Sequence, residues 1–309
     1  MNVSLALTWQ LVRLGLNGAV TGYPAYFFTV NTGLTLLFVL DGWWLETSSL
    51  EGEVGGEKLA RRAGARETGP VGNDAERRFC NIIDEFAIAA SMAPPQAMVL
   101  ERVDAINAFA AVWHTDDAVV AVTRGALDHL TRDELQGLVA HEFSHIREGD
   151  TRLNMHLAGM VLGLELIFNL GRHMCSQDDD GHYPFTASPG LAVMACGSLG
   201  WLGGRVLKAA TSRQREFLAY ARAVQFTRSK DGLGCMLRKV AGEGAALSPR
   251  QLNPAVQHTL LVGAAGGDKA GWLAAHPALS ERIRRIYGRP TPPMPLQRDV
   301  EPTRSGALF

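Results

Sequence analysis

Long apolar stretches alternate with segments of mixed polarity along this chain of 309 residues. A helix needs about 20 predominantly apolar residues to cross a bilayer. Three stretches approach or exceed that length with few or no charged side chains, namely residues 14–40, 153–170 and 181–204. The first predicts an N-terminal membrane segment within residues 1–50, and the other two predict an apolar hairpin at about 153–206.

Both membrane assignments have an alternative. Residues 14–40 could form a buried helix pair of a soluble protein, whereas a cleavable signal peptide fits poorly because the first basic residue is Arg13. Glu165 lies within the hairpin, and a carboxylate costs about 3 kcal/mol at the middle of a bilayer. The side chain of Glu165 therefore faces an interior, or the hairpin only dips into the membrane.

The segments between the apolar stretches have the periodicity of a folded domain. Asn73 and Glu76 have capping-box spacing at the start of an amphipathic helix, and Thr131 and Glu134 repeat that spacing before a helix that continues into His141. Short apolar runs predict strands at 97–100, 108–114 and 118–123, and further helices are expected at 209–240 and 277–287. We therefore expect a mainly α fold with a small β-sheet.

Polar, glycine-rich and proline-rich segments suggest where the domain begins and ends. Residues 46–72 are charged and glycine-rich, which predicts a juxtamembrane linker. We expect one domain over residues 51–289, interrupted by the apolar hairpin. The proline-rich residues 290–309 predict a disordered tail.

Charge and cysteine content narrow the possible partners. The chain has 30 basic and 31 acidic side chains, a net charge of −1, and no basic stripe, so nucleic acid is not an expected partner. The 4 cysteines are widely separated, which predicts free thiols. Basic residues are concentrated on the domain side of the apolar hairpin, whereas its opposite loop, 171–188, contains Arg172 and three aspartates. By the positive-inside rule, the domain should face the cytoplasm.

One run carries a specific chemical signature. His141-Glu142-Phe143-Ser144-His145 is an H-E-x-x-H pattern, expected by chance only roughly 0.01 times in a chain of this composition. A spacing of four places both imidazoles on one helix face, where they can bind a single Zn²⁺. Glu142 is then placed to deprotonate a zinc-bound water. Two ordinary surface histidines are the alternative.

A catalytic zinc takes a third protein ligand and keeps its fourth position for water. The candidate is Glu216, a carboxylate on a predicted helix just after the apolar hairpin. A solvated glutamate on a helix surface is the alternative, and spacing alone does not decide between the two.

Six runs occur in a characteristic order: Ile106–Ala110, Val122–Gly125, Asp133–His145, Arg215–Ala219, Ala223–Thr227 and His276–Ile283. In that order and spacing, they resemble the HtpX-like and CAAX prenyl protease family of membrane zinc endopeptidases, over about residues 55–287. The resemblance implies that His141, His145 and Glu216 bind zinc and that Glu142 is the catalytic base. It also implies a mostly helical, zincin-like domain whose active site lies near the membrane surface.

The chain departs from the family pattern after the proposed third ligand. The family has E-x-x-x-D there, with an aspartate expected to orient a ligand histidine, and this chain has Tyr220 in its place. Losing such a partner commonly costs about 10- to 100-fold in metal affinity or activity. Arg222 also stands where a small residue is expected.

Two other polar residues have open roles. Asp150 follows Gly149 and is expected to cap the next helix, with a contact to the zinc histidines as the alternative. His276, before Pro277, is expected at a helix start, or else to stabilise the tetrahedral intermediate. The strand 108–114, if it is an exposed sheet edge, could hold an extended peptide over the metal.

We therefore expect a membrane-anchored zinc endopeptidase that binds one Zn²⁺ per chain and hydrolyses peptide bonds in unfolded or membrane proteins. Its partners would be a polypeptide substrate and the lipid of a bacterial inner membrane, and the sequence leaves the oligomeric state open. One alternative, suggested by Tyr220, is a degenerate pseudoprotease that binds zinc or membrane partners without turnover. Another is a soluble zinc protease with a very apolar core.

Overall fold

The computed structural model describes residues 6, 9–10, 13, 22–48, 55–69, 73–112, 117–176, 187–243, 261, 274 and 276–295. The chain divides into two compact units. We call residues 1–51 and 152–212 the helix unit, and residues 52–151 and 213–309 the sheet unit.

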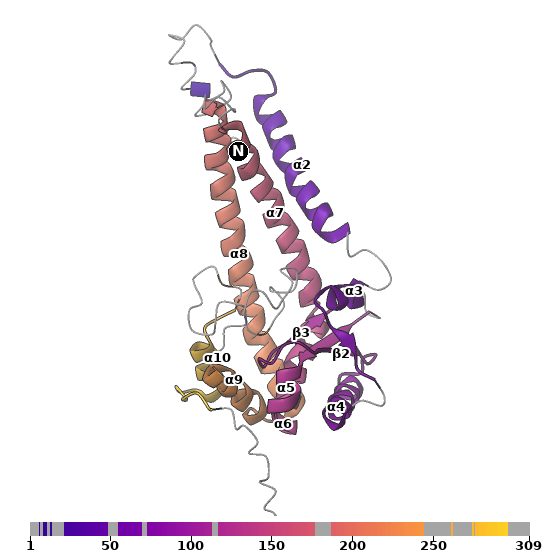
Figure 1. Ribbon diagram of the computed structural model, residues 1–309. Coiled ribbons are helices and arrows are strands. Elements are labelled where there is room, and N and C mark those ends of the chain that lie inside the picture. Colours follow the sequence, from indigo (N-terminus) through magenta and orange to yellow (C-terminus); the bar gives the residue numbers. More distant parts are fainter. Residues whose placement is uncertain are drawn as a thin grey trace, which may run out of the picture. The chain divides into compact units, whose positions relative to one another are not determined.

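The described elements confirm a mainly α fold with a small β-sheet (Figure 1). The helices are α2 (Phe27–Ser48), α3 (Gly55–Arg62), α4 (Asp74–Ala90), α5 (Arg124–His129), α6 (Arg132–Glu148), α7 (Asp150–Met174), α8 (Ala187–Thr227), α9 (Asp231–Glu243) and α10 (Leu279–Tyr287). The strands are β1 (Arg66–Glu67), β2 (Gln96–Leu100), β3 (Ala108–Ala111) and β4 (Val119–Thr123).

The sheet has four strands in the order β1-β2-β4-β3. Strands β2 and β4 are parallel, and the two outer pairs are antiparallel. All residues of β3 and β4 are buried, because their alanine, valine and phenylalanine side chains pack into the core on both faces. Although β3 lies at the edge of this sheet, it is not freely exposed: the backbone N–H of Leu261 donates to the carbonyl of Ala108 at 3.0 Å.

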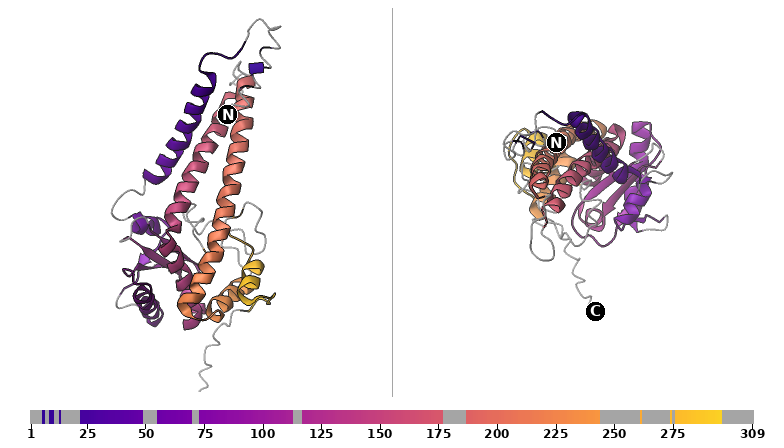
Figure 2. Two further views of the ribbon diagram at one scale, coloured as in Figure 1. Left: turned by 180° about the vertical axis from the view of Figure 1, so that it is seen from behind. Right: turned by 90° about the horizontal axis from the view of Figure 1, so that it is seen from above.

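Helix α6 is fixed in the core of the sheet unit at its start and along its length. Its capping box is formed as predicted, with Thr131 as the N-cap and Glu134 at the third position. Glu134 also accepts a hydrogen bond from the buried Lys239 of α9 at 2.7 Å. A Cβ added at Gly137 would lie 2.4 Å from the backbone nitrogen of Leu233, so α6 and α9 pack with their backbones close together. Helix α10 lies beside α9 (Figure 2).

The described part of the helix unit contains α2, the apolar part of α7 and the apolar part of α8. Glycines let these helices approach closely: a Cβ at Gly42 would lie 2.3 Å from the backbone nitrogen of Gly163, and one at Gly197 would lie 2.5 Å from that of Phe168. Close approach at small residues is the usual packing of helices in lipid. His156 packs within the unit, where its Nδ1 accepts a hydrogen bond from Trp43 at 2.7 Å.

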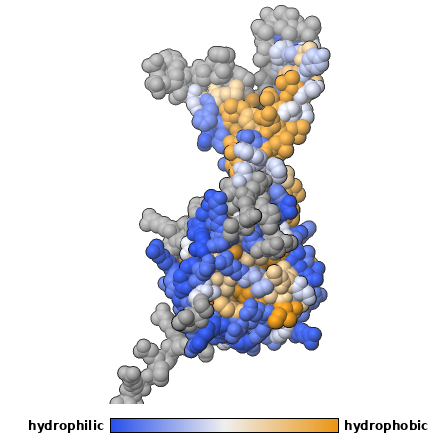
Figure 3. Space-filling model, turned by 90° about the vertical axis from the view of Figure 1, so that its right-hand side faces the viewer, coloured by the Kyte–Doolittle hydropathy of each residue, from blue (hydrophilic) through white to orange (hydrophobic). Residues whose placement is uncertain are grey.

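The outward surface of the helix unit is apolar. Figure 3 shows hydrophobic side chains gathered on one face of these helices. Leucines of α2 and α8 are among those exposed, namely Leu36, Leu37, Leu40, Leu191, Leu199 and Leu207. In the described part of the chain, two helical stretches are long and apolar enough to cross a membrane, Arg152–Met174 and Gly190–Thr227. Helix α2 is not among them, so a span near the N-terminus stays a prediction.

Two expectations about loops need correction. The predicted linker at 46–72 contains α3 and β1, and Leu59 and Ala60 of α3 are buried, because the charged residues of this amphipathic helix alternate with an apolar face. The prediction of a disordered tail at 290–309 does not hold for its first residues, 290–295. Met294 donates its backbone N–H to the carbonyl of Arg238 at 2.9 Å, which orders residues up to 295 against α9. Residues 296–309 lie outside the described part.

Candidate metal centre

Helix α6 presents His141, Glu142 and His145 together in the core of the sheet unit. The two histidines are four positions apart on the helix, so both imidazoles leave the same face. His141 and Glu142 are 0% and 1% exposed. Because burying polar groups without partners is costly, this cluster indicates a built site rather than chance surface histidines.

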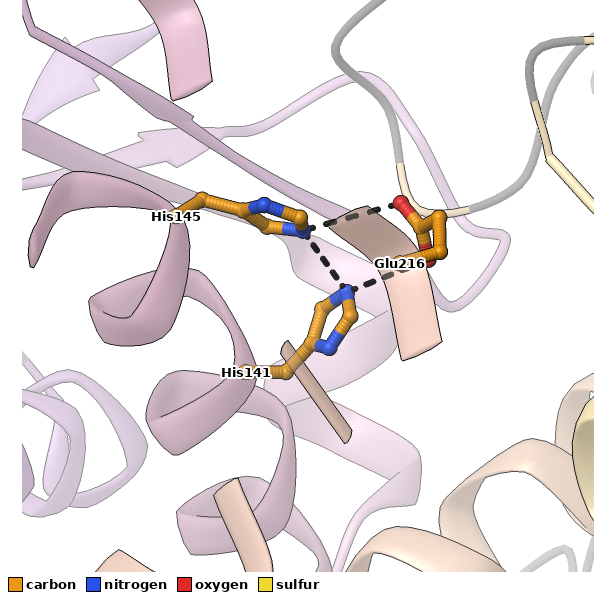
Figure 4. A group of neighbouring side chains, drawn as sticks. All are labelled: His141, His145 and Glu216. Atoms are coloured by element: carbon orange, nitrogen blue, oxygen red, sulfur yellow. Dashed lines mark hydrogen bonds and ion pairs between the residues drawn. The ribbon is translucent and has the colours of Figure 1, made fainter. Parts of the chain in front are cut away.

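Glu216, on the part of α8 that belongs to the sheet unit, completes a group of three donors (Figure 4). The Nε2 atoms of His141 and His145 are 3.1 Å apart. The Glu216 carboxylate lies 3.7 Å from the first and 3.6 Å from the second. Tetrahedral zinc at about 2.0–2.1 Å from each ligand holds neighbouring ligand atoms roughly 3.4 Å apart. The donor types and their separations therefore fit a zinc ion.

Glu142 lies beside the three donors and has an altered acidity. Burial raises its pKa from 4.5 to about 7, although nearby His145 and the backbone N–H of Ala110 on β3 act in the opposite direction. A carboxylate with a pKa near neutrality can both accept and return a proton at physiological pH. Strand β3 thus contacts the same carboxylate that the sequence predicts as the base.

Asp150 holds the second histidine. Gly149 ends α6 in the left-handed conformation, with φ of 66°, and this sharp turn returns Asp150 towards His145. The Nδ1 of His145 lies 2.6 Å from the Asp150 carboxylate, which Arg215 of α8 also contacts. Burial lowers the pKa of His145, but the hydrogen bond with Asp150 and nearby carboxylates outweigh it and raise the pKa to about 9.

The structure thus favours one of the two roles considered for Asp150. Its carboxylate contacts the histidine, which is the arrangement that orients a metal ligand and fixes its tautomer. Arg215 also donates to the carbonyl of Glu148 at 2.7 Å, and Arg222 pairs with the carboxylate of Glu148 at 3.0 Å. These two arginines of α8 therefore fasten the end of α6 next to Asp150.

The first histidine has different surroundings. Burial lowers the pKa of His141 well below 6.5, so its imidazole is neutral, as metal binding requires. The ring of Tyr220 stacks on His141 with 4.8 Å between centroids and 16° between planes. The Tyr220 hydroxyl donates to the Glu216 carboxylate at 2.7 Å, and His276 Nδ1 lies 2.9 Å from the same carboxylate.

All seven residues singled out in the sequence lie in this one region: His141, Glu142, His145, Asp150, Glu216, Tyr220 and His276. Sequence reasoning missed the roles of two arginines. Arg282 is 1% exposed and lies 3.9 Å from Glu216, and Arg215 contacts Asp150. Both arginines lie in the runs that resemble the protease family. Nothing in the sequence, however, distinguishes them from arginines on the protein surface.

A capped helix with H-E-x-x-H beside a carboxylate from a later helix is the arrangement of a metallopeptidase. Residues 73–289 match the model of peptidase family M48, and the chain belongs to that family. The resemblance seen in the sequence motifs is thereby confirmed.

Curated relatives agree with this assignment. The chain is 31% identical to a protease HtpX homolog of Acidiphilium cryptum, over 82% of this chain and 92% of that protein. It is also 31% identical to a protease HtpX homolog of Dictyoglomus thermophilum, over 67% of each chain. Among solved structures, Ste24p of S. mikatae matches with a TM-score of 0.46 and 13% identity, over 92% of this chain and 66% of that one.

Proposed function

We propose that this chain is a membrane-anchored, zinc-dependent endopeptidase that cleaves unfolded or membrane polypeptides at the cytoplasmic face of a bacterial inner membrane. One observation carries the proposal. The ligand atoms of His141, His145 and Glu216, from two helices, lie within 4.8 Å of one another, and the buried Glu142 stands beside them.

The residues of the site would have two separate roles, zinc binding and proton transfer. His141, His145 and Glu216 would hold one zinc ion per chain. When bound, zinc supplies electrophilic polarisation of the scissile carbonyl and lowers the pKa of water. Glu142 removes a proton from the attacking water and then delivers it to the departing amine. In the metal-free site, burial raises the pKa of this carboxyl from 4.5 to about 7, which favours its exchange of a proton with water near neutral pH.

Other residues support the base and the ligands. Asp150 holds the ring of His145 in one orientation, and Arg215 holds Asp150. The N–H of Ala110 fixes the Glu142 carboxylate against β3. An extended substrate bound beside β3 would lie close to this base, although the contact from Leu261 limits pairing at Ala108. A role for His276 in stabilising the tetrahedral intermediate stays a prediction.

Membrane anchoring is supported by the helix unit. Two stretches, in α7 and α8, have the length and hydropathy of membrane spans. Their exposed leucines would contact lipid chains rather than water. The arginines near their domain ends, including Arg152 and Arg205, favour a cytoplasmic location for the sheet unit. A soluble zinc protease would instead appear in the cytosolic fraction without detergent.

The test is hydrolysis of an unfolded, casein-like substrate by the full chain, purified in detergent and supplied with zinc. Wild type should cleave the substrate. Glu142→Gln should cleave it about 10²- to 10⁴-fold more slowly, which is the usual contribution of a general base. Equal activity in the variant would rule out the proposed mechanism.

A second candidate function is that of a pseudoprotease, which the neutral Tyr220 favours. It predicts zinc binding by the wild type without detectable cleavage. In that case a carboxylate introduced at position 220 should create activity that the natural chain lacks. If activity changes little, Tyr220 is a tolerated variant of the family pattern.

A further inference from the structure

Tyr220 contacts two of the three proposed ligands at once. It follows Glu216 by one helical turn on α8 and is 4% exposed. Its hydroxyl lies 2.7 Å from Glu216 Oε2, and its ring stacks on the imidazole of His141. Rotation of the Glu216 carboxylate would break this phenol hydrogen bond and the contact with His276 Nδ1 at 2.9 Å.

The two histidines differ in what holds them. His145 has Asp150 on its Nδ1 at 2.6 Å. The Nδ1 of His141 is buried and has no hydrogen-bond partner among the described residues. A metal-binding histidine usually donates its other ring N–H to an acceptor that fixes the ring. For His141, the ring of Tyr220 stacks on one face of the imidazole and the ring of His145 packs edge-on against it, so the stack with Tyr220 helps to fix the ring plane.

We propose that Tyr220 is a positioning residue for metal binding, whose hydroxyl holds the Glu216 carboxylate and whose ring holds the imidazole of His141. This inference rests on the proposed zinc site. This role differs from that of the aspartate in the family pattern, which is expected to orient a ligand histidine. The phenol of Tyr220 instead donates a hydrogen bond to Glu216, the proposed third ligand.

Arg282 is a buried cation close to both Tyr220 and Glu216. Its guanidinium lies 5.3 Å from the centre of the Tyr220 ring and donates to the carbonyl of Leu261 at 2.8 Å. Its Nε and Nη2 have no hydrogen-bond partner among the described residues, and Nη2 lies 3.9 Å from Glu216. The Glu216 carboxylate thus lies near both Arg282 and the two histidines. The phenol hydrogen bond therefore keeps this carboxylate directed at the two histidines.

The test is the zinc affinity of the full chain in detergent, measured by competition with a chromogenic chelator. Tyr220→Phe removes the hydroxyl and keeps the stacked ring, and we expect it to weaken zinc binding by about 10- to 100-fold. Tyr287→Phe is the matched control. It removes a hydroxyl in the same unit that lies 3.7 Å from Cys235 Sγ, and it should leave the zinc affinity unchanged.

A second measurement separates positioning from general stability. With Co²⁺ in place of zinc, the visible spectrum reports the coordination geometry, so Tyr220→Phe should change its band positions or intensity while the metal-free melting temperature stays close to wild type. If Tyr220→Phe has the zinc affinity and the cobalt spectrum of wild type, the positioning role of Tyr220 is wrong, while the proposed zinc site still stands. If wild type binds no zinc, the proposed function falls as well.

Discussion

Replacing Glu142 by glutamine should stabilise the metal-free protein while it removes catalysis. In the folded state, burial raises the pKa of this carboxyl from 4.5 to about 7. The folded protein therefore binds more protons than the unfolded chain between these two pH values. Its free energy of unfolding falls as the pH rises through that window, and the loss is complete above about pH 7.

The size of the effect follows from the shift. A change from 4.5 to about 7 corresponds to about 3 kcal/mol at 1.36 kcal/mol per pKa unit. Glutamine has a similar shape and cannot ionise, so Glu142→Gln avoids this loss. At pH 8 the metal-free variant should exceed wild type by up to about 3 kcal/mol, or roughly 5–10 °C in melting temperature. Near pH 4.5 the two proteins should melt together.

The assay is thermal unfolding of both proteins in detergent with a chelator, at pH 4.5 and pH 8. Glu85→Gln is the control, because it makes the same chemical change at a carboxylate whose side chain is 47% exposed. A variant no more stable than wild type at pH 8 would refute the argument that burial sets the acidity of Glu142.

Three further predictions test other parts of the structure. Asp150→Asn should weaken zinc binding by about 10- to 100-fold, because His145 loses its charged partner, and unchanged affinity in chelator competition would contradict this. Gly163→Ala should lower the melting temperature in detergent, at a cost of about 1–3 kcal/mol, because its Cβ would meet the backbone of α2 at 2.5 Å. Gly203→Ala should leave the melting temperature unchanged, because no atom lies within 4 Å of its added Cβ. Equal melting temperatures of the two variants would contradict the close packing of α7 against α2. Tyr220→Asp should weaken zinc binding, because it removes both the ring stacked on His141 and the hydroxyl that donates to Glu216, and equal or tighter binding in chelator competition would contradict the positioning role.

The local parts of the fold could be predicted from the sequence because their signals are local. Capping-box spacing indicated the starts of α4 and α6, where Asn73 and Thr131 are the N-caps, and a spacing of four indicated the shared face of the two histidines. Glu216 could be singled out as the proposed third ligand only with the family resemblance, because the path of α8 brings it to the two histidines. No periodicity in the sequence encodes that path.

Other features depend on contacts between distant segments. The parallel pairing of β2 with β4 places β3 at the edge, and strand patterns do not contain this order. Helix α8 continues from apolar into polar sequence as one element, because no glycine or proline interrupts its hydrogen bonds between Arg205 and Thr227. Arg282 and Arg215 look like surface charges in the sequence, and only the fold brings them to Glu216 and Asp150.

His141, His145 and Glu216 are proposed to bind one zinc ion beside the base Glu142. The most direct measurement is the zinc content and zinc affinity of the purified full chain and of Glu216→Ala. We predict one zinc per wild-type chain and a large loss of affinity in the variant, with the two remaining histidines unable to retain the ion through dialysis. A wild type that binds no zinc, or a Glu216→Ala variant that binds it equally well, would contradict the account.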